Sequence, residues 1–304
     1  MVYGNWVDPI PTRDLVDPFV VRPGKKISLH RDFDPGFKLK RISKLEAKAL
    51  LQTGIERLAK YQDMLYAEHS HSVLIILQAM DAAGKDGVIK HVMSGLNPQG
   101  CQVYSFKAPS DEDLNHDYLW RCAKNLPERG RIGIFNRSYY EEVLVVRVHP
   151  EFLARQRLPP DLKGKDIWRR RFEEMNHFER YLTDNGIQVI KLYLNLSKAE
   201  QRRRFLARIE RPEKNWKFST ADAAERGHWD EYMHAYEEMF EKTSTAWAPW
   251  YVVPADTKWF CRLVVSNIVY DRMKAIHPRY PDVSEAQKEE LSKARILLER
   301  NGNR

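Results

Sequence analysis

Gly84 and Lys85 lie where a phosphate-binding loop needs a glycine and a lysine. The apolar residues 73–77 precede a turn of small residues and a basic amphipathic stretch, which predicts a buried strand, a tight loop and a helix. In such a loop, backbone N–H groups and the helix N-terminus attract an anion, and a lysine adds a mobile cation. We therefore expect five consecutive residues to contact phosphate groups: Ala83, Gly84, Lys85, Asp86 and Gly87.

The loop departs from the G-x-x-x-x-G-K-[ST] pattern at two positions. Ala79 replaces the first glycine, and Asp86 replaces the hydroxyl residue that usually binds the metal. Asp81 is a carboxylate among expected phosphates, and it would be repelled unless a divalent cation lay between them. We therefore expect Asp81 to hold Mg²⁺. The alternative is an ordinary strand-to-helix turn with a surface lysine, because short motifs occur by chance.

Asn136 and Arg137 follow a second apolar run, residues 132–135. Many phosphate-loop enzymes carry a metal-directed aspartate at the position of Asn136. Because asparagine carries no charge, we expect Asp81 to be the main metal ligand instead. Arg137 would offer a permanently charged, forked donor to a phosphoryl group in transfer. The alternative is a polar strand end in which Arg137 pairs with a nearby glutamate, Glu141 or Glu142.

A third cationic group lies in residues 197–217, which contain eight Lys or Arg and three Glu. Arg204 and Arg208 are four residues apart and share one face of the expected helix. Because the segment follows a predicted strand, it could form a lid that folds arginines over phosphates, although a solvated basic face is the common alternative. Arg121, on another predicted helix, could bind the phosphate of an acceptor nucleotide or form a surface ion pair.

The composition favours a cytoplasmic protein that binds polyanions. The 304 residues carry a net charge of +8, with a sequence pI near 9.2. Three widely spaced cysteines predict a reducing compartment, and no apolar stretch is long enough for a signal peptide or a membrane span. We therefore expect no membrane association. The histidine spacing argues against a zinc site, and no serine or cysteine lies in a nucleophile elbow.

Strands and helices alternate along the chain, which predicts a parallel sheet covered by helices on both faces. Ligands collect at the carboxyl ends of strands in such sheets. The expected strands are residues 73–77, 103–106, 132–135, 187–194 and 250–253. The expected helices include one that begins after the capping box at Ser43, then residues 111–125, 167–183 and 258–275.

The chain divides into an arm, a main domain and a terminal helix. We expect residues 1–42 to form an extended arm that lies on the main domain. Its aromatic residues Trp6, Phe19 and Phe33 would anchor it there. Residues 43–277 predict the catalytic domain, with the lid at about residues 197–230. Residues 278–304 predict a helix that packs on the surface or on another subunit.

Taken together, these residues resemble the second family of polyphosphate kinases. The motifs that carry the resemblance span about residues 45–270, in one order: MDAAGKDG (80–87), GLNP (95–98), YLWR (118–121), FNRSYYE (135–141) and NWKF (215–218). The resemblance implies a thymidylate kinase-like P-loop fold with a helical lid. It also implies Mg²⁺-dependent, reversible transfer of phosphoryl groups between inorganic polyphosphate and nucleotides.

The resemblance assigns roles to matching residues. Asp81 would bind metal and relay phosphate, Lys85 would bind phosphate, Arg137 would clamp the transferring charge, and Arg208, or Arg204 as second choice, would act from the lid. Asn136 and the sequence YEEVL (140–144) look like the third class of the family, whose members accept both AMP and ADP and give ADP and ATP. Glu141 would then lie near the nucleotide.

Two other functions remain open from the sequence, and the oligomeric state is a further expectation. One alternative is an ATP-dependent nucleotide or small-molecule kinase on the same fold. The other is a nucleic-acid-binding protein that uses its basic face with stacking aromatic residues. Because the sequence has no recognisable nucleic-acid-binding motif, we expect no nucleic-acid partner. We also expect a homo-oligomer.

Overall fold

The computed structural model describes residues 12–216 and 218–301, and within these ranges five parallel strands form one sheet. The strand order is β2-β3-β1-β4-β5, so the predicted parallel α/β sheet is confirmed. The strands are β1 (Ser72–Gln78), β2 (Cys101–Ser105), β3 (Ile132–Asn136), β4 (Ile187–Asn195) and β5 (Trp250–Pro254).

The central strand β1 fixes the position of the loop that follows it. All seven of its residues are buried, as expected for a strand covered on both faces. β1 lies between β3 and β4, and its Leu77 is opposite both Asn136 and Leu192. The register therefore places the end of β1 beside the polar residues that follow β3.

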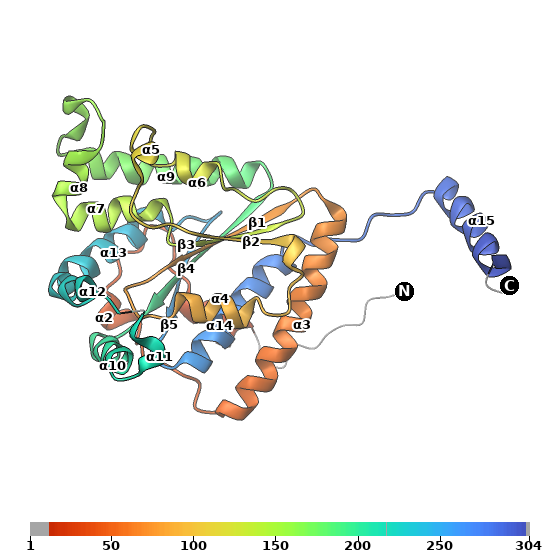
Figure 1. Cartoon of the computed structure of the whole chain (residues 1–304), viewed down its shortest axis with the longest axis horizontal. Coiled ribbons are helices and arrows are strands. Elements are labelled where there is room, and N and C mark those ends of the chain that lie inside the picture. The colour runs from red at the N-terminus through yellow and green to blue at the C-terminus, as the bar shows by residue number, and fades with distance from the viewer. Residues whose placement is uncertain (1–11, 217, 302–304) are drawn as a thin grey trace.

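Helices cover both faces of the sheet and form two apolar cores (Figure 1). Three helices pack in the first core: α3 (Lys44–Glu68), α4 (Lys85–Val92) and α14 (Lys258–Lys274). α9 (Ile167–Asp184), α13 (Trp229–Thr243) and the 3-10 helix η3 (Tyr139–Val143) pack in the second. The predicted capping box begins α3, since Ser43 Oγ accepts from the N–H of Glu46.

The N-terminal segment lies on the main body from residue 12 onward. It contains α1 (Thr12–Leu15), η1 (Asp17–Phe19) and α2 (Leu29–Asp32). Phe19 is buried against Phe260 of α14, and Phe33 packs on the second core, so both predicted anchors are confirmed. The N–H of Val21 donates to the carbonyl of Trp250 at 2.8 Å, which ties the arm to β5. The third predicted anchor, Trp6, lies outside the described residues.

The single helix predicted for residues 111–125 is wrong. The structure has two short helices instead, α5 (Asp111–Leu114) and α6 (Trp120–Ala123). Asp117 causes the interruption, because its carboxylate accepts from the N–H of Leu119 and forms a turn between them. Short helices also connect β3 to α9: α7 (Val145–Val148), α8 (Pro150–Arg155) and η4 (Pro160–Lys163). η2 (Pro98–Gly100) precedes β2.

The basic segment after β4 is helical and broken at Pro212. It consists of α10 (Lys198–Ile209), α11 (Pro212–Asn215), α12 (Thr220–Glu225) and η5 (Arg226–His228). Proline lacks a backbone N–H, so it ends one helix and begins another.

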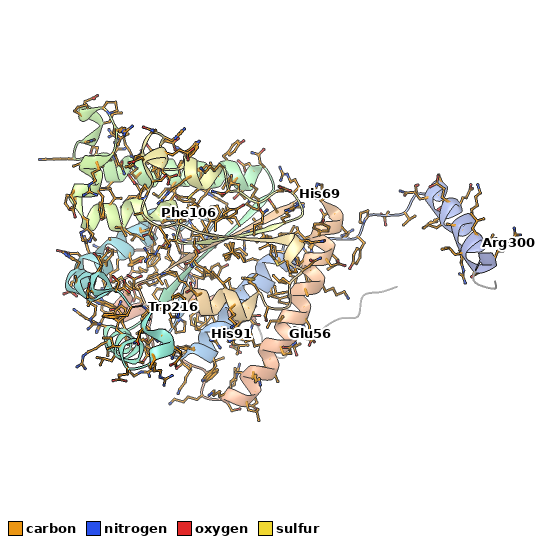
Figure 2. The ribbon with its side chains drawn as sticks, in the orientation of Figure 1. Glu56, His69, His91, Phe106, Trp216 and Arg300 are labelled. Carbon is orange, nitrogen blue, oxygen red and sulfur yellow. The ribbon has the colours of Figure 1, made fainter. Side chains whose placement is uncertain are left out.

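The last helix, α15 (Glu285–Asn301), extends away from the body, and Figure 2 shows Arg300 far from the sheet. The expected packing on the chain's own surface is therefore not observed, and packing on another subunit stays a prediction. None of the helices within residues 12–216 and 218–301 is long and apolar enough to cross a bilayer.

Gly95 provides a test of how closely α3 approaches the loop after α4. A Cβ at Gly95 would lie 2.3 Å from Cγ2 of Ile55. We expect Gly95→Ala to lower the free energy of unfolding by about 1–3 kcal/mol, since overpacking forces the backbone apart. Urea denaturation measures the loss. Gly227→Ala is the control, because a Cβ there meets nothing within 4 Å, and the contact argument is wrong if both variants lose equal stability.

Candidate active site

A cavity of about 730 Å³ lies at the carboxyl ends of the strands. The loops after β1, β2, β3 and β5 line it together with α10 and α11. Ten of its lining residues are Lys or Arg, and only Asp81 and Asp86 are acidic. The cationic residues are Lys85, Lys107, Arg137, Arg203, Arg204, Arg208, Arg211, Lys214, Lys258 and Arg262. Such a surface attracts a polyanion, because clefts lined by one sign of charge focus the field.

Gly84 allows the loop after β1 to turn into α4. Its φ of +108° lies in the left-handed region, where a side chain would be strained. Lys85, the next residue, donates from Nζ to the carbonyl of Ala79 at 2.9 Å. Burial, helped by the charge of Arg137, lowers the pKa of Lys85 to about 8. Lys85 lines the cavity, and a phosphate bound beside it would raise this pKa again and keep the amine charged.

Arg137 links the loop after β1 to the loop after β3. Its Nη2 donates to Oδ1 of Asp81 at 2.6 Å, and its Nη1 lies 3.8 Å from a carboxylate oxygen of Glu141. Glu141 chiefly raises the pKa of Arg137, while burial raises the pKa of Glu141. The predicted convergence of Asp81, Lys85 and Arg137 on one cavity is observed. Glu142 is not a partner of Arg137, because it pairs with Arg171 at 3.1 Å.

Asn136 lies against the start of α4. Its Nδ2 donates to Oδ1 of Asp86 at 3.0 Å, and both residues line the cavity. Asp81 and Asp86 are thus the two carboxylates available to a cation there. Among the described residues, no group of three or more His, Cys, Asp or Glu could hold a metal ion. The donor set fits Mg²⁺, which commonly takes one or two carboxylates and completes its shell with water and substrate phosphates.

The two lid arginines have different surroundings. Arg204 is buried, and its guanidinium donates to the carbonyls of Ala82, Ala83, Ala255 and Asp256. It therefore joins the loop after β1 to the end of β5. Arg208 lines the cavity and makes a 3.5 Å contact with Asp222. These surroundings suit Arg204 to structural support and Arg208 to ligand binding.

Arg121 is beside the cavity but not in its lining. It donates to the carbonyl of Lys107 at 2.7 Å, and its guanidinium lies over the ring of Phe106, labelled in Figure 2. Phe106 and Lys107 do line the cavity. The structure thus leaves the role of Arg121 as a prediction.

Comparison with known proteins identifies the family. The sequence model of "Polyphosphate kinase 2 (PPK2)" matches residues 41–281. The chain belongs to the polyphosphate kinase 2 family. It is 51% identical to an ADP-polyphosphate phosphotransferase of Rhodopseudomonas palustris, over 92% of this chain and 97% of that protein. It is 43% identical to an AMP/ADP-polyphosphate phosphotransferase of Meiothermus ruber, over 86% of this chain and 94% of that protein.

The fold also matches that of a solved family member. The crystal structure of polyphosphate kinase 2 from Arthrobacter aurescens TC1 superposes with a TM-score of 0.81 at 41% identity. The match covers 90% of this chain and 95% of the other. The P-loop kinase-like fold expected for this chain is therefore confirmed.

Outside residues 197–217, sequence reasoning missed three cationic residues of this polyphosphate kinase 2 cavity: Lys107, Lys258 and Arg262. Lys258 and Arg262 lie in the first turns of α14, just beyond β5, and both line the cavity. Two signals could have found them: their spacing of four residues, and their position after a parallel strand. Gln201 was also missed. Its side chain donates to the carbonyl of Asp81 at 3.0 Å, which docks α10 on the loop.

The lowered pKa of Lys85 predicts pH-dependent binding of a phosphate chain. Anionic phosphates bind the protonated amine, so the contribution of Lys85 to the affinity for inorganic tripolyphosphate should be complete well below pH 8 and fall as the pH rises through the pKa of about 8. Calorimetric titration at pH 7 and pH 9 measures the change. Lys85→Arg keeps its charge and should show a smaller change, and an equal pH dependence in both proteins would contradict the assignment.

Proposed function

We propose that this chain is a polyphosphate:nucleotide phosphotransferase that uses Mg²⁺ and transfers phosphoryl groups reversibly from inorganic polyphosphate to AMP and ADP. The observation that carries the proposal is the cation-lined cavity on which Asp81, Lys85 and Arg137 converge. The donor and the acceptors are supported by two relatives that resemble the chain over most of its length, an ADP-polyphosphate phosphotransferase and an AMP/ADP-polyphosphate phosphotransferase. Asn136 and the sequence YEEVL (140–144), which look like the third class, favour acceptance of both nucleotides.

The residues supply what phosphoryl transfer requires, namely positioning and charge neutralisation without a covalent nucleophile. Lys85 and the backbone of residues 83–87 would bind phosphate oxygens. Arg137 would stabilise the charge of the transferring group through its forked donors. Arg208 would approach from the lid, and Glu141 would lie near the nucleotide.

Mg²⁺ would be held by Asp81, with Asp86 as the other carboxylate in the cavity, together with phosphate oxygens. When bound, it would neutralise phosphate charge that the side chains leave uncovered. Asp81 is held in place by Arg137 and, through its own carbonyl, by Gln201. These contacts hold the Asp81 carboxylate in the cavity lining.

The cationic residues beyond the loop suit a long donor. Lys214, Lys258 and Arg262 extend the basic lining towards α11 and α14. A single nucleotide carries few phosphates, whereas a polyphosphate chain carries about one negative charge on each phosphate group along its length. This lining therefore favours polyphosphate over a compact phosphate donor such as ATP.

The remaining expectations are part of the same proposal. Residues 43–277 would form the catalytic domain, with an arm before it and α15 after it. The three free cysteines suit a reducing, cytoplasmic setting. A homo-oligomer would give α15 a surface on which to pack.

The activity itself is the first test of this proposal. Purified protein with polyphosphate and Mg²⁺ should produce ADP from AMP and ATP from ADP, measured by chromatography. Lys85→Ala and Asp81→Ala should each lose transfer by about 10²-fold or more, because each removes charge neutralisation at the reacting group. Chelation of Mg²⁺ should also abolish the activity.

Each outcome of this assay has a distinct meaning. Product from ADP alone would exclude the third-class assignment but keep the donor. Robust transfer from ATP to a different acceptor without polyphosphate would favour the other kinase hypothesis. Near-normal turnover of both variants would overturn the site.

The two lid arginines give a second prediction. Arg208→Ala should reduce turnover with little change in unfolding midpoint, because Arg208 is partly exposed and its contact with Asp222 is long, at 3.5 Å. Arg204→Ala should reduce both turnover and the unfolding midpoint, since it removes the donor from four buried or partly buried carbonyls. Arg202→Ala is the control, an exposed arginine of α10 outside the cavity. Equal effects on stability from all three variants would contradict this division.

A further inference from the structure

An ion pair is buried beneath the segment that carries Arg137. Lys191 of β4 and Glu179 of α9 are both fully buried, and Lys191 Nζ donates to Oε2 of Glu179 at 2.6 Å. A buried pair of this kind is seldom the most stable choice, because desolvation costs several kcal/mol per ion and apolar residues of similar volume often serve as well. The position of Lys191 between the buried apolar residues Ile190 and Leu192 suggests a use other than stability.

The pair holds the hydroxyl groups of two adjacent tyrosines. Tyr139 and Tyr140 both donate to Oε1 of Glu179, at 2.8 and 2.7 Å. Lys191 completes its three bonds with the hydroxyl of Tyr140 at 3.0 Å and the carbonyl of Thr243 at 2.6 Å. Every proton of the lysine is therefore used. A fully satisfied network in a dry interior is rigid.

The tyrosines belong to η3, which begins two residues after Arg137. Arg137 has a φ of +65°, a left-handed conformation that a side-chain-bearing residue adopts only when its surroundings hold it there. Ser138 supports the same turn, since its hydroxyl accepts from the N–H of Tyr140 at 3.2 Å. The next residue after the tyrosines is Glu141, which contacts Arg137. Fixing η3 from below therefore fixes the direction of both side chains above it.

We infer that Glu179 and Lys191 are positioning residues, which act through Tyr139 and Tyr140 to aim Arg137 at the phosphoryl group. The inference rests on the proposed function of Arg137. Neither α9 nor β4 lines the cavity. Under this inference, the buried charges of this helix and this strand still determine where Arg137 points during transfer. A small displacement of a charged donor is costly, because a shift of about 1 Å can reduce a rate by about 10²-fold.

Removal of the two hydroxyl groups tests the inference with little change in packing. Tyr139→Phe/Tyr140→Phe should lower kcat about 10- to 100-fold with little change in the KM for ADP, because Arg137 acts on the transition state. Tyr193→Phe is the matched control. Tyr193 lies on β4 two residues beyond Lys191 and is fully buried, and its hydroxyl has no hydrogen-bond partner among the described residues. Its kcat should equal that of the wild type.

A double-mutant cycle separates positioning from a general loss of structure. In an Arg137→Lys background, the same two phenylalanines should cost much less activity, because the group they position is already gone. Rates are measured per folded protein, from the circular dichroism of each sample. An equal fold loss in both backgrounds, or no loss in either, would overturn the inference.

A crystal structure gives a readout that does not depend on activity. The bond between Arg137 Nη2 and Asp81 Oδ1, 2.6 Å here, should be kept in Tyr193→Phe and lost or lengthened in Tyr139→Phe/Tyr140→Phe. An unchanged bond in the double variant would contradict positioning. A wild-type protein without phosphotransferase activity would instead refute the proposed function, and the structural comparison would still decide the role of the network.

Discussion

The mutual repulsion of cations at one edge of the sheet is the constraint on which the site depends. The cavity lining carries ten basic and two acidic side chains, the same excess as the +8 of the whole chain. The remainder of the molecule is therefore close to neutral. Charges so concentrated raise the energy of the protein without ligand. The protein's own acceptors must offset this repulsion until an anionic ligand is bound.

The strand order determines which acceptors are available. Placing β1 between β3 and β4 brings three loops to one point, each from a different part of the chain. Asp81 from the first loop can then accept from Arg137 of the second. α10, which follows β4, reaches the first loop through Gln201 and Arg204. A different order of the same strands would move the loop after β1 away from at least one of these partners.

The sequence predicted much of this because strong local signals coincide with the fold. Apolar runs located all five strands, and strand ends located Asp81, Lys85 and Arg137. What it missed depended on contacts between distant residues. Nothing local shows that Arg204 faces backbone carbonyls, or that Lys191 within an apolar strand meets Glu179 twelve residues earlier. The break within residues 111–125 was missed because the turn at Asp117 competes with weak helical periodicity.

The arginines of the cavity differ in the partners that hold them, and this difference suits Arg204 to structural support and the others to ligand binding. Arg204 is held by four carbonyls that belong to the loop and to the end of β5, so moving it would disturb the loop itself. Arg137 is held by a carboxylate that shares the cavity, so a phosphate group can compete for its donors while the backbone below stays fixed. Arg208 contacts Asp222 of α12, within the segment expected to move as a lid. The buried backbone beneath the cavity is rigid, whereas the ion pairs of Arg137 and Arg208 can be exchanged for contacts with phosphate. The site can therefore bind a ligand without a change in its shape.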